Sequence, residues 1–164
     1  MNPFTVSTTI DLPREQVFDY LSDIANHAEF TDHYLVDWHL TRENSVGTGA
    51  GARFRIRAPL NRFSWADLSF HEVEAPHRIL ERGRGGKYNR IRMLGTFVLS
   101  TGPGGSTKVE YTLETEVKLP SDKLMEVLGG RGWHRRKAAR GMRRLREILE
   151  EDRSRGKRVS VAAR

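Results

Sequence analysis

Apolar and polar residues alternate along the middle of the chain, with a period of two between residues 34 and 118. The clearest run is residues 107–118, where Val109, Tyr111 and Leu113 fall on one side and polar residues on the other. Such alternation predicts β strands that bury one face and leave the other in water. Residues 4–11, rich in β-branched residues, add a further strand. The pattern therefore predicts about seven strands, at residues 4–11, 34–43, 52–57, 64–73, 78–83, 90–100 and 107–118.

Two other segments follow the helical period. Residues 14–24 begin after Pro13, a residue suited to a first helical turn, and residues 25–30 continue as a second short helix or a turn. Near the end of the chain, a single apolar stripe predicts a long helix that starts at Ser121 or Asp122 and ends at about residue 151. Its apolar positions are Leu124, Leu128, Ala138, Met142, Leu145 and Leu149.

Three glycines fall inside this long helix, at Gly129, Gly130 and Gly132. Each costs about 1 kcal/mol relative to alanine in a helix interior. One interpretation is a break, so that the main helix starts near Gly132. The other is that the small residues leave room for a ligand and open a portal. In both cases Trp133 is a candidate for the mouth of a cavity.

An antiparallel sheet with one apolar face must be covered, and the long helix is the element available to cover it. This order of elements, from residue 4 to about 151, resembles the helix-grip fold of the START-like (SRPBCC) superfamily of polyketide cyclases/dehydrases and lipid-transfer proteins. The stretches that carry the resemblance are "IDLPREQVFDYLSD", "SVGTGAGARFRIR", "HEVEAPHRILERG" and "GGSTKVEYTLETEV". The predicted class is α+β, with one domain at residues 1–151 and a basic, disordered tail at residues 152–164.

The resemblance implies an apolar cavity between sheet and helix in which family members bind lipids, polyketides or similar molecules. Strand alternation and the helical stripe predict that hydrophobic or aromatic side chains line it and bind the ligand, whereas the alternative is a filled core. Few polar groups are expected on this face, namely Ser64, Glu81, Tyr111 and Thr115. The predicted ligand-binding residues are Trp38, Phe54, Leu68, Phe70, Met93, Phe97, Tyr111, Trp133 and Met142.

An enzyme of the cyclase or dehydratase type would need an acid–base pair inside the cavity. Asp67 and His71 fall on the opposite face of their strand, so we expect no such pair and a binding protein rather than an enzyme. The glycines of "GTGAGA" (residues 47–52) precede a strand, whereas a dinucleotide site needs a helix there. No two of the six histidines stand four apart or form an H-x-H pair, and we expect most of them in turns or at the surface, with no metal and no cofactor.

Charge is distributed unevenly along the chain. The net charge is +7, and residues 1–130 carry −2 while residues 131–164 carry +9. A third hypothesis is therefore an RNA- or ribosome-binding protein that acts through its basic helix. That segment has Trp133 as its only aromatic residue, so we expect a structural helix and no specific nucleic-acid binding.

The chain contains no cysteine and no apolar run of the length that a bilayer requires. A disulfide framework and a thiol nucleophile are therefore excluded. From these features we expect a cytoplasmic protein without membrane insertion. The oligomeric state and the identity of the ligand stay open.

Overall fold

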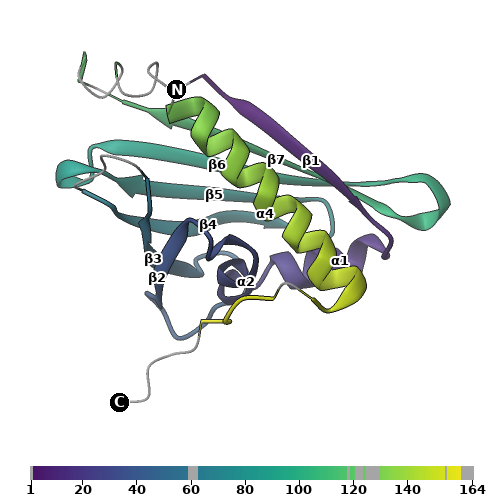
Figure 1. The fold of residues 1–164 in the computed structure, drawn as a ribbon. Helices are drawn as coiled ribbons and strands as arrows, with labels where there is room; N and C mark the ends of the chain where they lie inside the picture. Colours follow the sequence, from purple (N-terminus) through teal and green to yellow (C-terminus); the bar gives the residue numbers. More distant parts are fainter. Residues whose placement is uncertain are drawn as a thin grey trace.

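The computed structural model describes residues 2–58, 63–117, 119–120, 124, 130–153 and 155–159. Its seven strands form one antiparallel sheet in the order β1-β7-β6-β5-β4-β3-β2 (Figure 1). The predicted α+β helix-grip fold is confirmed. The strands are β1 (Phe4–Ile10), β2 (Leu35–Leu40), β3 (Gly51–Ile56), β4 (Trp65–Glu74), β5 (Arg78–Gly85), β6 (Ile91–Thr101) and β7 (Thr107–Glu116).

Helical elements connect β1 to β2, and a further helix follows β7 in the chain. They are α1 (Arg14–Leu21), the short 3-10 helix η1 (Ile24–Asn26), α2 (His27–Thr31) and α4 (Arg131–Glu151). Single 3-10 turns, η2 (Lys87–Asn89) and η3 (Pro103–Gly105), join β5 to β6 and β6 to β7. Figure 1 shows α4 running diagonally across one face of the sheet, with α1 and α2 at the end of that face. The sheet and the helices therefore form two layers with the core between them.

The short helices form where local signals favour them. Pro13 precedes α1, and its carbonyl oxygen accepts hydrogen bonds from the backbone N–H groups of Gln16 and Val17 at 3.1 and 3.3 Å. The side chain of Asp23 caps η1 by accepting a hydrogen bond from the N–H of Ala25 at 3.0 Å. These two contacts fix the direction in which the chain leaves β1 and enters α2.

Helix α4 buries one stripe against β1 and α2. Its buried residues are Ala138, Gly141, Met142, Leu145 and Ile148. Ile148 is fully buried and Leu149 only partly, so the stripe ends one position earlier than the sequence pattern indicated. The helix begins at Arg131, and most of the preceding predicted helix, including Gly129, lies outside the described residues.

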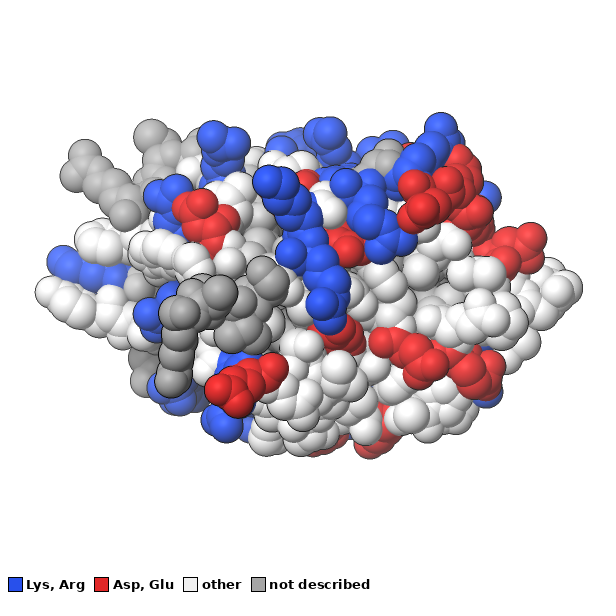
Figure 2. Space-filling view, turned by 90° about the horizontal axis from the view of Figure 1, so that it is seen from below, with Lys and Arg blue, Asp and Glu red and all other residues white. Residues whose placement is uncertain are grey.

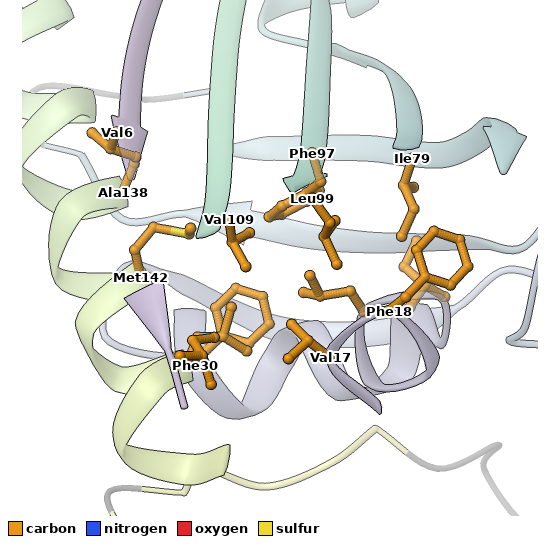
Figure 3. Close-up of a cluster of buried hydrophobic side chains, with 14 of the residues drawn as sticks. Val6, Val17, Phe18, Phe30, Ile79, Phe97, Leu99, Val109, Ala138 and Met142 are labelled. Carbon is orange, nitrogen blue, oxygen red and sulfur yellow. The ribbon is translucent and has the colours of Figure 1, made fainter. Parts of the chain in front are cut away.

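The core lies where the sheet meets α1, α2 and α4. In Figure 3, Phe97, Leu99 and Val109 project from the sheet toward Val17 of α1 and its neighbours. Phe30 of α2 and Met142 of α4 close the same cluster from the other side. This packing holds α2 between the sheet and α4.

Two register shifts interrupt the alternation. In β2 the pairing with β3 jumps between Val36 and His39, and Asp37 between them has φ of +53°. Because a bulge changes which side chains share a face, Leu35 rather than Val36 lies with Trp38 on the cavity wall. Strict alternation within residues 34–43 would have placed Val36 on the same face as Trp38, so the predicted alternation is wrong at this position. The second shift, in β4, lies between Phe70 and Glu72, beyond the residues that line the cavity.

The structure differs from the expectation of a disordered tail after residue 151. Residues 155–159, which we call the C-terminal segment, lie along η1 and α2 and bury Val159 to 8% exposure. The N–H of Val159 donates to the carbonyl oxygen of Ala25 at 3.2 Å. Arg155 donates to the buried carboxylate of Glu29 at 2.6 Å. Residues 160–164 lie outside the described residues.

Several arginines near the end of the chain form ion pairs or hydrogen bonds within the fold. Arg144 forms an ion pair with Asp32 and donates to the carbonyl oxygen of Glu29 at 2.9 Å. Arg146 pairs with Glu150 at 2.9 Å, four residues further along the same helix. Figure 2 shows that this side of the molecule mixes Lys and Arg with Asp and Glu. Much of the local positive charge is thus met by nearby carboxylates.

We expect Gly141→Ala to stabilise the protein by about 0.4–1 kcal/mol, because alanine lowers the entropy of the unfolded chain and favours the helix. An added Cβ would lie 3.5 Å from the carbonyl oxygen of Phe30, which is an ordinary contact. Urea unfolding measures the change. Gly83→Ala is the control, since its Cβ would lie 2.8 Å from the backbone oxygen of Asp67 and should destabilise. A loss of stability in Gly141→Ala would contradict this packing.

Removing the side chain of Arg155 should destabilise the protein by about 1–3 kcal/mol, because the Glu29 carboxylate loses a charged partner. Glu29 is 5% exposed and keeps the hydroxyl of Tyr20 at 2.6 Å. The measurement is thermal unfolding of Arg155→Ala beside Arg153→Ala, whose ion pair with Glu151 is exposed. Equal stability of the two variants would show that the C-terminal segment is not held on α2.

Candidate functional site

A cavity of about 70 Å³ lies between the sheet and the helices α2 and α4. Its wall is mostly apolar, and six strands (β2 to β7), the segment before β2 and both helices contribute to it. It is lined by His27, Phe30, Thr31, Tyr34, Leu35, Trp38, Phe54, Ile56, Leu68, Glu81, Met93, Gly95, Phe97, Tyr111, Leu113, His134, Ala138, Gly141 and Met142. A volume of this size holds a few water molecules.

Small residues beside aromatic ones make this space. Gly95, Ala138 and Gly141 remove side-chain volume from β6 and α4. The aromatic rings pack on one another instead of filling the gap, with 4.5 Å between the centroids of Trp38 and Phe54. The same distance separates Phe97 from Tyr111. The wall therefore combines rigid rings with a central hollow.

Seven of the nine residues predicted to bind a ligand lie on this wall: Trp38, Phe54, Leu68, Met93, Phe97, Tyr111 and Met142. Phe70 is 1% exposed and packs behind the wall, with its ring centroid 5.4 Å from that of His27. Trp133 also lies off the wall and contacts Tyr34, with 6.0 Å between ring centroids. Ligand binding by the seven residues stays a prediction.

Glu81 is the polar centre of the cavity. It projects inward from β5 between Ile79 and Gly83 and is 2% exposed. Its Oε1 lies 3.4 Å from Nδ1 of His27, at the start of α2, and forms no hydrogen bond among the described residues. The other ring nitrogen of His27, Nε2, lies 2.8 Å from the carbonyl oxygen of Leu21. Since a carbonyl only accepts, Nε2 carries the proton and Nδ1 presents its lone pair to Glu81.

The hydroxyl of Tyr111 donates a hydrogen bond to the carboxyl group of Glu81. Both groups meet over Gly95, the residue opposite Glu81 in the sheet and close to Tyr111 on the adjoining strand. A Cβ at position 95 would lie 2.6 Å from Oε2 of Glu81 and 3.0 Å from the Tyr111 hydroxyl oxygen. Gly95 is therefore required for the two polar groups to approach each other.

Burial leaves this group of side chains uncharged near neutral pH. Loss of hydration raises the pKa of Glu81 to about 8, although the bond from Tyr111 opposes the shift. Loss of hydration lowers the pKa of His27 to about 4. Burial also raises the pKa of both Tyr34 and Tyr111 above the ordinary value. Near pH 7 Glu81 is mostly a neutral acid and His27 a neutral base.

The expectation that the cavity holds no acid–base pair is therefore wrong, because His27 and Glu81 lie together on its wall. Strand alternation had already predicted that Glu81 and Tyr111 face inward. The sequence analysis had left His27 among the histidines expected in turns or at the surface. The missed signal is helical spacing, since His27, Phe30 and Thr31 are three and four residues apart and all line the cavity.

The pair that was considered for catalysis lies outside the cavity. Asp67 accepts hydrogen bonds from Arg53 at 2.6 and 3.0 Å on the outer face of the sheet, and His71 is exposed. The described residues include no group of three His, Asp or Glu side chains arranged to hold a metal ion. Within the same part of the chain, no helix is both long and apolar enough to cross a bilayer.

Comparison with known proteins gives one family and several solved structures. Residues 1–150 match the model of the family described as polyketide cyclase / dehydrase and lipid transport. The search of curated proteins gives no match. Among solved structures, TTHA0849 from Thermus thermophilus is 16% identical with a TM-score of 0.69, over 90% of this chain and 96% of that one.

Two further structures share the fold at similarly low identity. Truncated norcoclaurine synthase from Thalictrum flavum is 14% identical with a TM-score of 0.68, over 92% of this chain and 94% of that one. Ara h 8.0201 is 14% identical with a TM-score of 0.54, over 85% and 95% of the two chains. These similarities show the architecture and leave the chemistry to the residues of the cavity.

Replacing Glu81 by Gln should change how stability depends on pH. The folded-state pKa of Glu81, about 8, lies above its ordinary 4.5. Its stabilising contribution is therefore complete below the ordinary pKa and is lost as the pH rises through about 8. Relative to the wild type, Glu81→Gln should gain stability over this range, by at most about 1.4 kcal/mol per pH unit.

Urea unfolding at a series of pH values measures this difference. Glu110→Gln is the matched control, because Glu110 lies beside Lys108 at the surface, with 2.9 Å between Nζ and Oε1. Its stability should stay parallel to that of the wild type. If the difference in unfolding free energy between Glu81→Gln and the wild type does not change with pH, the folded protein does not hold Glu81 as a neutral acid.

Proposed function

Because the chain belongs to the polyketide cyclase/dehydrase and lipid-transport family, we propose that it binds a small hydrophobic molecule in the cavity between the sheet and α4. The observation that carries this proposal is a mostly apolar hollow with a few polar groups converging on it. Ligand sites in proteins have this composition. Burying the apolar surface of a ligand against Trp38, Phe54 and Phe97 supplies about 25 cal/mol per Å².

The size of the cavity limits how a ligand enters. Its 70 Å³ is well below the roughly 300–1,000 Å³ of pockets for drug-sized molecules. Any ligand larger than a few atoms requires wall side chains to move. Met93 and Met142 suit this role, because methionine has three flexible bonds and adapts to irregular space. We therefore infer that the cavity widens as it is occupied.

Filling the cavity should abolish binding. Met93→Trp adds a bulky ring on the inner face of β6, whereas Val98→Trp adds the same ring on its outer face, where Val98 is 41% exposed. A neutral acylated naphthalene dye, whose emission shifts to shorter wavelength in apolar surroundings, reports occupancy. We expect binding to the wild type and to Val98→Trp and at least about tenfold weaker binding to Met93→Trp.

Mass spectrometry of an organic extract of the purified protein identifies any molecule that is retained from the cell. A hydrophobic compound present in the extract of the wild type and missing from that of Met93→Trp would support the cavity as its site. Dye binding that is equal in both tryptophan variants would place the ligand elsewhere and would refute the proposal.

A second candidate is acid–base catalysis of the cyclase or dehydratase type. The observation that favours it is a neutral carboxylic acid, Glu81, beside the unprotonated Nδ1 of His27 in an apolar site. Such a pair can give a proton to a carbonyl oxygen while a base removes a proton from the neighbouring carbon. Enolisation of a ketone is the simplest reaction of this kind.

Deuterium exchange into the methyl group of acetophenone in heavy water tests this candidate. A C–H bond breaks, the proton passes to a base such as His27 Nδ1, and the enol oxygen takes the proton of Glu81. Return of a deuteron to carbon completes the exchange. We expect acceleration within the roughly 10²–10⁴-fold range of general acid–base catalysis, and loss of most of it in Glu81→Gln. Equal exchange rates with the wild type and with Glu81→Gln, measured by NMR, would exclude this role.

A further inference from the structure

The residues that line the cavity disfavour the binding of an anionic ligand. Among the described residues that line it, none is Lys or Arg, and the titratable ones are His27 of α2, Tyr34 before β2, Glu81 of β5, Tyr111 of β7 and His134 of α4. An anionic ligand such as a carboxylate would have to lose its hydration beside a carboxyl group and without a lysine or arginine from this wall. Burying an unpaired charge in this way is costly.

A ligand without any polar atom is also a poor match. Oε1 of Glu81 is buried and makes no hydrogen bond within the described part of the chain. The distance of 3.4 Å to His27 Nδ1 is too long for a good bond. A purely apolar molecule would leave this oxygen unsatisfied, whereas a hydrogen-bond acceptor on the ligand would satisfy it.

We propose that Glu81, as a neutral acid, donates a hydrogen bond from Oε1 to the carbonyl oxygen of an uncharged ligand, and that Tyr111 positions it by donating to Oε2. This inference rests on the proposed function and names its ligand class: neutral ketones and quinones rather than fatty-acid anions. Gly95 supports the arrangement, because a side chain there would separate Glu81 from Tyr111. Glu81 contacts the ligand directly, whereas Tyr111 acts through Glu81.

Three molecules of similar shape test the ligand class by displacing the neutral dye from the wild-type protein. They are acetophenone, which has a carbonyl oxygen, ethylbenzene, which has no polar atom, and benzoate, which is an anion. At about pH 6.5 we expect acetophenone to bind about 5–10-fold more tightly than ethylbenzene, the gain expected from one hydrogen bond. Benzoate should bind more weakly than both.

The pH dependence identifies the donor. At about pH 9.5 Glu81 has lost its proton, because this value lies above its pKa of about 8, and the preference for acetophenone should disappear. His27, with a pKa of about 4, does not change over this range, and the pKa values of Tyr34 and Tyr111 are raised. Glu81→Gln keeps an N–H donor, so it should retain the preference at both pH values. Glu81→Met should lose it at both.

Tyr111→Phe separates positioning from a merely structural role. The bond from Tyr111 lowers the pKa of Glu81, so its removal should move the loss of preference to higher pH. If acetophenone and ethylbenzene displace the dye equally from the wild type at both pH values, the polar group does not recognise the ligand, and this inference fails while cavity binding stands. If the dye does not bind at all, both proposals fail.

Discussion

The buried carboxyl group of Glu81 lies beside the neutral His27 and accepts a hydrogen bond from Tyr111. The arrangement of the cavity depends on this cluster of three side chains. It needs Gly95 on the adjacent strand, because any Cβ there would collide with Oε2. It also needs α2 to bring His27 within 3.4 Å of Oε1. Burial among apolar rings reduces the hydration of the acid, and this loss raises the pKa of Glu81. The same packing therefore determines both the shape of the cavity and the raised pKa of Glu81.

The position of α2 links this centre to distant parts of the chain. His27 and Glu29 are close neighbours on α2, and Glu29 is held from outside by Tyr20 and Arg155. Arg144 of α4 bonds to the carbonyl oxygen of Glu29 as well. A five-residue helix has little stability of its own, so these tertiary contacts fix where His27 lies. Residues more than a hundred positions away thus determine the geometry beside Glu81.

Periodicity alone was sufficient for the sheet, the covering helix and most of the cavity wall, because strand alternation and a helical stripe report burial directly. Periodicity failed at the bulge around Asp37, because a bulge changes which side chains share a face of the strand. As a result Leu35 rather than Val36 lies on the cavity wall. His27 was missed because its helical spacing with Phe30 and Thr31 covers a single turn, which is too short to establish a helical period without the structure. The packing of Val159 depends on ion pairs between partners far apart in sequence, which no local pattern contains.

The opposite pKa shifts of His27 and Glu81 determine how many protons the chain takes up or releases when it folds. Between the ordinary values of 4.5 for Glu and 6.5 for His, the unfolded chain carries an imidazolium and a carboxylate at these positions. In the folded protein both are neutral. Folding in this range therefore moves one proton from the histidine to the glutamic acid with no net exchange with the buffer. Near pH 7, where the unfolded imidazole is already mostly neutral, the same event draws a proton from solution.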